Sequence, residues 1–165
     1  MAIHHAGFTM IEMMVVVAIV AILALMAAPN FQYQIIRDQI NTALPLADIA
    51  KAPVATSWAI AQTLPADNAA AGLPAADKIV NNYISSVQVQ DGAIHVTFGN
   101  RVNAIIKDKI LTLRPAVVED APVVPVAWVC GAAEVPGKMT VKGMDRTDVP
   151  AAYLPFSCRA RNTPK

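Results

Sequence analysis

The sequence has few of the groups from which active sites are built. It contains three histidines and two cysteines, and only 15% of its residues are charged. There is no Cys-x-x-Cys pair, no Ser/His/Asp constellation, no glycine-rich phosphate loop and no carboxylate cluster at metal-binding spacing. His4 and His5 lie near the amino terminus, and His95 stands alone in a predicted strand, where a histidine is more often a surface residue than a ligand or base. We therefore expect neither enzyme activity nor a cofactor.

A strong excess of charge of either sign is also lacking. Thirteen lysines and arginines balance twelve aspartates and glutamates, which gives a net charge of +1. DNA binding is left open, but the charge does not indicate it. The length of 165 residues suits one modest domain plus a long helix.

One apolar run dominates the amino-terminal part of the chain. Residues 7–12 (GFTMIE) lead into residues 13–28, which are uncharged. As a helix, residues 8–28 would span about 31 Å, roughly the hydrocarbon core of a membrane. Glu12 is the single charged residue in this segment, and a carboxylate there costs about 2.5–3.5 kcal/mol on insertion scales. Glu12 therefore needs a specific role.

Two common kinds of amino-terminal segment explain this run less well. A secretory signal has a basic first region, an uninterrupted apolar core and small residues before its cleavage site. Residues 1–7 contain no lysine or arginine, and Glu12 interrupts the core. Residues 26–28 (MAA) lack the small-x-small spacing, and Pro29 follows them. A plain single-span anchor would account for the apolar run but would leave Glu12 unexplained.

Beyond Pro29, apolar residues recur at steps of three and four. This spacing predicts an amphipathic helix whose apolar stripe faces a core. The stripe comprises Ile36, Ile40, Leu44, Ala47, Ala50, Val54 and Trp58. Pro45 and Pro53 lie within the pattern, and a proline inside a helix removes a hydrogen bond and clashes with the preceding turn. We expect bends or a break at these prolines.

A hairpin is predicted after a connecting loop. Residues 64–78 are rich in Ala, Pro, Asp and Gly and predict a surface connection. Residues 87–90 and 93–98 flank Asp91-Gly92, a pair favoured in two-residue hairpin turns. In residues 93–98, Ile, Val and Phe alternate with Ala, His and Thr, which predicts one buried face.

Two further strands would complete an antiparallel sheet. Residues 110–114 predict a strand that ends before Pro115, and residues 124–130 predict another. Pro125 makes the start of the latter irregular or places it at an edge. About four antiparallel strands laid over the helix stripe can bury a shared core, so the fold class is α+β.

Cys130 and Cys158 are the only cysteines, and both follow the apolar segment. An even pair in a domain beyond the membrane indicates one disulfide in an oxidising compartment. Closing a carboxyl-terminal loop of this size would stabilise the fold by about 3–4 kcal/mol. A redox-active pair is the alternative, but the Cys-x-x-Cys spacing typical of such pairs is absent.

These motifs resemble those of a known family. Residues 7–12, the apolar run and Pro29 resemble the class III signal of type IV prepilins, and Pro29 falls where these proteins commonly carry a helix-kinking proline. Residues 83–87 (YISSV) and 153–159 (YLPFSCR) are similar to segments of class a pilins from Gram-negative bacteria. One departure is Ala6, since the leader of this family often has a lysine or arginine before the glycine.

The resemblance implies specific roles for the amino-terminal residues. Prepilin peptidase would cleave between Gly7 and Phe8 and would then methylate the new amino group of Phe8. Glu12 would pair with that amino group in a neighbouring subunit, which fixes the register of assembly more than it adds net stability. Alternatively, Glu12 snorkels to the headgroups or is protonated in the membrane. Pro29 would permit local melting of the helix as the apolar segments pack in a filament.

The same resemblance divides the chain and implies its function. The expected parts are a cleaved leader (1–7), a transmembrane and filament-core helix (8–28), an amphipathic half-helix (29–62), a connecting loop (63–86), an antiparallel sheet (87–130) and a disulfide-bounded region (131–165). We expect a major pilin of the type IV pilin fold that forms a helical homo-oligomer. Its partners would be prepilin peptidase, the inner-membrane pilus assembly machinery and, before assembly, membrane lipid.

The expected location is the inner membrane first and then a surface pilus of a Gram-negative bacterium. A minor pilin that primes the filament or binds DNA or a surface is the main alternative. A type II secretion pseudopilin is another, although the disulfide-closed carboxyl end counts against it. The sequence does not distinguish adhesion, twitching motility and DNA uptake.

Overall fold

The structure, a computed structural model, describes residues 7–161, with the side chains of residues 27–30 excepted. It divides into two compact units, Met1–Ile35 and Ile36–Lys165. We call the second unit the head. Residues 1–6 of the predicted leader lie outside the described residues.

The first helix, α1, spans Met10–Ala43. Residues 10–26 are all exposed, although nearly all of them are apolar. The helical stretch Met10–Ala61 includes a segment that is long and apolar enough to cross a membrane. The range of α1 includes Pro29, but the side chain of Pro29 lies outside the described part, so the expected kink stays a prediction.

The helix changes character at the first of the two later prolines, as predicted. The 3₁₀ turn η1 (Leu44–Ala47) carries Pro45 in its first turn and separates α1 from α2 (Asp48–Ala61). A 3₁₀ turn at this point accommodates the proline because the regular α-helical hydrogen bond is already lost. Pro53, by contrast, lies inside α2, which continues through it.

The predicted apolar stripe faces the core of the head. Ile36, Ile40, Ala43, Ala47, Ala50 and Val54 are fully buried, and Trp58 is nearly so. Leu44 was expected on this stripe but is only partly buried, and Ala43 takes its place. The reason is local: Leu44 opens the 3₁₀ turn, which has three residues per turn instead of 3.6 and so rotates the face.

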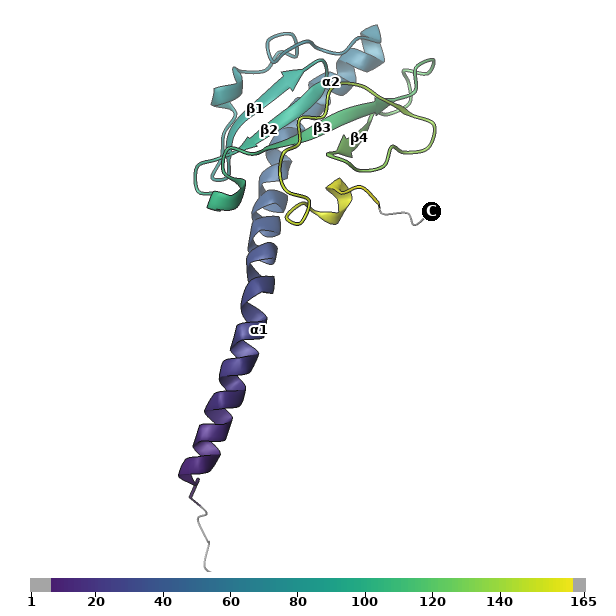
Figure 1. The fold of residues 1–165 in the computed structure, drawn as a ribbon. Coiled ribbons are helices and arrows are strands. Elements are labelled where there is room, and N and C mark those ends of the chain that lie inside the picture. The colour runs from purple at the N-terminus through teal and green to yellow at the C-terminus, as the bar shows by residue number, and fades with distance from the viewer. Residues whose placement is uncertain (1–6, 162–165) are drawn as a thin grey trace, which may run out of the picture. The chain divides into compact units, whose positions relative to one another are not determined.

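The stripe packs with an antiparallel sheet in the order β1-β2-β3-β4 (Figure 1). These strands are β1 (Ile84–Gln90), β2 (Ala93–Phe98), β3 (Ile110–Val117) and β4 (Ala127–Cys130). Asp91 and Gly92 turn the β1–β2 hairpin with positive φ angles of 49° and 79°, as the Asp-Gly pair predicted. The α+β pilin-type fold expected from the sequence is therefore confirmed.

Strand boundaries differ from the prediction in three places. β1 begins at Ile84, within the predicted connecting loop, and β4 begins only at Ala127. β3 does not end before Pro115 but runs to Val117. A proline without an N–H is tolerated there because the last β2–β3 pair is Ile94 with Leu113, so at Pro115 no β2 partner loses a hydrogen bond. A short strand that was not predicted, β5 (Thr140–Val141), pairs with the end of β3.

The expectation that β2 buries only one face is wrong. Ala93 and His95, on the second face, are buried as deeply as Ile94 and Val96. Residues 143–147 lie over this face: Gly143 approaches Ala93, and the Arg146 N–H donates to Oγ1 of Thr112 on the neighbouring strand β3. His95 is therefore a core residue and not the surface residue that we predicted.

Candidate assembly site

Glu12, one of the predicted site residues, lies in the first turn of α1 and takes part in a helix cap. Thr9 precedes the helix, and its Oγ1 accepts a hydrogen bond of 3.3 Å from the backbone N–H of Glu12. A threonine followed three residues later by glutamate is the capping-box pattern, and a carboxylate in the first turn also suits the helix dipole. Our sequence reasoning missed this local role of Glu12, although the Thr-x-x-Glu spacing signals it.

The Glu12 side chain itself is exposed and makes no hydrogen bond or ion pair with the described residues. Phe8 is 73% exposed, and Gly7 has open space around its Cα. The predicted cleavage bond between Gly7 and Phe8 is thus accessible. Pro29 lies further along the same helix, and the two cysteines lie in the head, so the predicted site residues do not form a single cluster.

The exposed apolar side chains of α1 are the most unusual surface of the chain. Large hydrophobic residues are uncovered on every side of residues 10–26, with Glu12 as their only charge. A soluble monomer rarely exposes a contiguous apolar patch of more than a few hundred square ångströms. This part of α1 therefore requires lipid or other protein around it.

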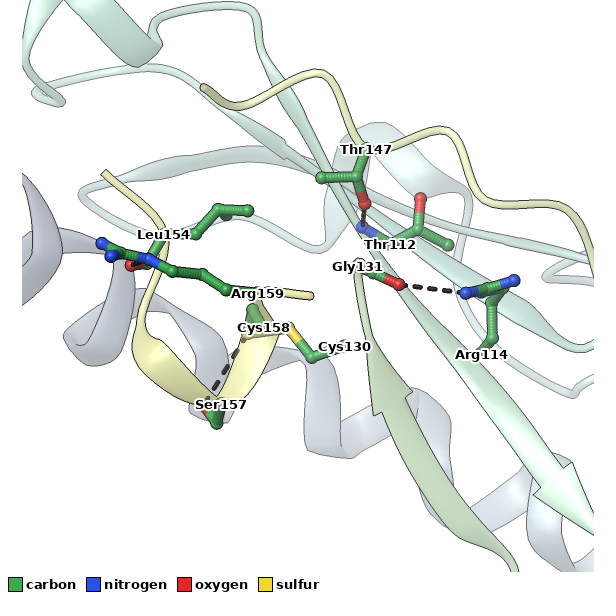
Figure 2. The surroundings of a disulfide bond; sticks show 9 residues. All are labelled: Thr112, Arg114, Cys130, Gly131, Thr147, Leu154, Ser157, Cys158 and Arg159. Carbon is green, nitrogen blue, oxygen red and sulfur yellow. Dashed lines mark hydrogen bonds between the residues drawn. A yellow bond between two sulfur atoms is a disulfide. The ribbon is translucent and has the colours of Figure 1, made fainter. Parts of the chain in front are cut away.

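The predicted disulfide joins Cys130, at the end of β4, to Cys158 in the 3₁₀ turn η4 (Phe156–Cys158). Their Cα atoms lie 4.5 Å apart, and both residues are buried. Figure 2 shows Arg159 beside this bond, where its Nε donates to the Leu154 carbonyl at 2.8 Å. The carboxyl end is thus closed onto the sheet, as expected.

The loop between the cysteines is also bound to the edge of β3. Oγ1 of Thr147 accepts a hydrogen bond of 3.1 Å from the Thr112 N–H (Figure 2). The Asp148 carboxylate accepts another from the Ile110 N–H. Within the same neighbourhood, Arg114 donates to the Gly131 carbonyl at 3.0 Å. The bonds from Thr112 and Ile110 occupy backbone N–H groups of β3 that would otherwise form a free sheet edge.

A cluster of basic and aromatic side chains lies next to the disulfide. The guanidinium carbons of Arg37 and Arg159 lie 5.3 Å and 4.8 Å from the centre of the Phe156 ring. Arg37 belongs to α1, Phe156 lies within the disulfide-bounded loop and Arg159 follows it, so only the fold brings them together. Sequence reasoning missed this cluster because no local pattern links residues so far apart.

His95 is the most deeply buried titratable side chain of the head. Its Nδ1 lies 2.9 Å from Oγ1 of Thr112, and its Nε2 has no partner among the described residues. Burial, and to a lesser degree the nearby Arg146, lower the pKa of His95 below its usual 6.5, while Asp145 opposes them. Across the described part of the chain, no three His, Cys, Asp or Glu side chains are grouped to hold a metal.

Two family models match the chain. The pilin family, which forms bacterial filaments, matches residues 37–159, and the prokaryotic N-terminal methylation motif matches residues 4–28. The second match includes Gly7, Phe8 and Glu12. The chain belongs to the pilin family.

Individual relatives agree with this assignment along most of the chain. A fimbrial protein of Neisseria meningitidis is 33% identical over 162 residues, which are 93% of each chain. The type IV major pilin protein PilE1 of Neisseria gonorrhoeae is 33% identical over 160 residues, or 93% of this chain and 86% of the relative. Fimbrial protein EcpC of Eikenella corrodens is 33% identical over 161 residues, or 96% and 93%.

Proposed function

We propose that this chain is the major structural subunit of a type IV pilus. It is made as a prepilin, is held in the inner membrane by α1, and is assembled into a surface filament of a Gram-negative bacterium. The observation that carries this proposal is the exposed apolar surface of residues 10–26, joined to a folded head with its own core. Lipid covers that surface before assembly, and the same segments of other subunits cover it afterwards.

Processing follows from the residues at the start of the chain. Prepilin peptidase cuts after Gly7 and methylates Phe8, and the inner-membrane assembly machinery then receives the mature subunit. A relative named as a type IV major pilin that matches 93% of the chain favours a major over a minor role. The head supplies the surface through which the filament serves adhesion, twitching motility or DNA uptake.

Subunit abundance tests the proposal. Filaments sheared from intact cells should consist mainly of this chain, and mass spectrometry should give a subunit that begins at methylated Phe8. A strain without the gene should lose its filaments. If the chain is present only in traces while another subunit forms the bulk, it is a minor pilin. If it stays in the membrane and filaments form without it, the proposal is wrong.

A further inference from the structure

One end of the head presents an aromatic side chain that two arginines contact. Phe156 is 79% exposed, although Arg37 and Arg159 both lie against its ring. We call these three residues the arginine–phenylalanine cluster. Aromatic residues and arginine are enriched in protein interfaces, above all where single residues contribute most of the binding energy.

The cluster is fixed in place before any partner arrives. Arg37 and Arg159 each donate a 2.8 Å hydrogen bond to the Ala152 carbonyl. Neither arginine forms an ion pair with a described carboxylate, so their positive charge is uncompensated within the described head. A side chain that is already ordered loses less conformational entropy on binding, which favours its use as an anchor.

A groove of about 300 Å³ lies elsewhere on the head, between α2 and the segment that connects β3 to β4. It is lined by Ala55, Thr56, Ala59 and residues 122–126. This volume is at the lower limit of the roughly 300–1,000 Å³ typical of ligand pockets and suits a protein side chain. Val123 at its border is 88% exposed. We call residues 119–126 the acidic–apolar segment.

The acidic–apolar segment carries charge opposite to that of the cluster. Glu119 is bound to Lys142, but Asp120 is exposed and has no ion pair with the described residues. A carboxylate beside an exposed apolar side chain is the complement of an arginine beside an exposed phenylalanine. Complementary charge of this kind favours one orientation of docking and disfavours others.

The two surfaces lie at opposite ends of the head. Arg37 belongs to the first helical turn of the head, whereas the groove contacts residues 55–59, which at 1.5 Å per residue lie about 30 Å further along the helix. Figure 1 shows η4 and the end of α2 correspondingly far apart. The surfaces therefore cannot meet within one copy. A contact between two different surfaces of identical copies repeats without closing and produces a fibre.

We propose that the arginine–phenylalanine cluster of one copy docks on the acidic–apolar segment and groove of a second copy of this chain. Phe156 lies against the groove at Val123, and Asp120 faces Arg37 and Arg159. The inference rests on the proposed function, since it assigns a head-to-head contact within the filament. A contact this small is weak alone, but it acts at high effective concentration once the α1 segments have packed.

Cysteine cross-linking in intact filaments tests this contact. The wild-type cysteines form the disulfide, and no other cysteine is present. The double variant Phe156→Cys with Val123→Cys should give a ladder of covalent oligomers when filaments are treated with a short bis-maleimide. The matched control is Phe156→Cys with Met144→Cys, because Met144 is also exposed but lies on the loop over the sheet. Equal ladders, or none in either variant, overturn the inference.

A charge reversal decides the matter if the double variant does not assemble. Asp120→Arg places a like charge opposite the cluster and should reduce filament yield about tenfold relative to wild type. Asp77→Arg, at another exposed acidic residue, should leave the yield near wild type. Equal yields from these two variants overturn the inference, while normal wild-type filaments leave the proposed function intact. A lack of wild-type filaments would contradict the proposed function as well.

Discussion

Arg37 and Arg159 donate hydrogen bonds to the same backbone oxygen, that of Ala152, although one lies in the helix and the other follows the second cysteine. The carboxyl-terminal region is thereby tied to α1 within the head. The disulfide ties it to β4, and Thr147 and Asp148 tie it to β3. The last part of the chain is thus bound to three separate elements.

Of these connections, the disulfide should contribute most to the stability of the head. Replacing both cysteines (Cys130→Ser with Cys158→Ser) should lower the free energy of unfolding by about 3–4 kcal/mol, because the unfolded chain regains the entropy of the opened loop. Surface filaments should decrease while leader cleavage continues. Urea unfolding of the full chain in detergent measures the stability, and an immunoblot follows cleavage. Free thiols in wild-type filaments, or a variant as stable as wild type, would contradict this prediction.

Local patterns were enough to predict the helix stripe, the hairpin turn and the break in the helix. The stripe from Ile36 to Trp58 depends only on helical spacing, and the Asp91-Gly92 turn depends on two residues that tolerate positive φ. The break at Pro45 follows from a missing N–H. Each of these features is decided by residues within one or two turns of each other, so the sequence alone specifies it.

Features that depend on distant residues were not predictable in this way. His95 is buried because residues 143–147 lie over its face, and strand alternation contains no information about that loop. β5 forms only because the loop passes the end of β3, and two residues are too few to give a pattern. The position of Phe156 against Arg37 likewise depends on the closed carboxyl-terminal region.

Buried His95 should make the head less stable in acid. Its pKa is lowered in the folded head by burial and by Arg146, so the unfolded chain takes up the proton first as pH falls below about 6.5. Stability should therefore be fully present above this pH and should fall as pH decreases toward the pKa of the folded state. One proton can contribute at most about 1.4 kcal/mol per pH unit. Urea unfolding at pH 8, 7, 6 and 5 measures the trend.

His95→Gln is the matched variant, because an amide can still bond to Thr112 but does not titrate in this range. The stability of wild type relative to this variant should be greatest at pH 8 and should decrease by pH 5. Parallel pH curves for the two proteins would show that other groups cause the acid dependence.

Processing should depend on the size of residue 7. Gly7→Val should give an uncleaved precursor that stays in the membrane, because the peptidase family requires a small residue before the cut. Gly7→Ala is the control and should be processed better than Gly7→Val. Mass spectrometry of each purified subunit detects the mature terminus at Phe8. A mature terminus near Ala28 in wild type would instead indicate an ordinary secretory signal.

Glu12 has two roles that variants can separate. The first is local: its backbone N–H donates to Oγ1 of Thr9, a bond that does not need the carboxylate. The second is the proposed pairing of its carboxylate with the Phe8 amino group of a neighbouring subunit, which requires the charge. Glu12→Gln keeps the capping pattern and removes the charge. Thr9→Ala removes the cap, at a cost of about 1 kcal/mol, and keeps the charge.

If the charge is what matters, Glu12→Gln and Glu12→Ala should be made, inserted and cleaved but should yield few filaments. Insertion should even improve, since loss of the carboxylate removes about 2.5–3.5 kcal/mol of unfavourable transfer. Thr9→Ala should assemble nearly as wild type. Filament counts by electron microscopy, set beside an immunoblot of the membrane pool, compare the three variants.

In a mixture with wild type, Glu12→Gln subunits should be under-represented in filaments, because they offer a normal Phe8 amine but cannot receive one. Abundant filaments from well-expressed Glu12→Gln would exclude charge pairing and favour the alternative, a carboxylate that snorkels to the headgroups or is protonated in the membrane.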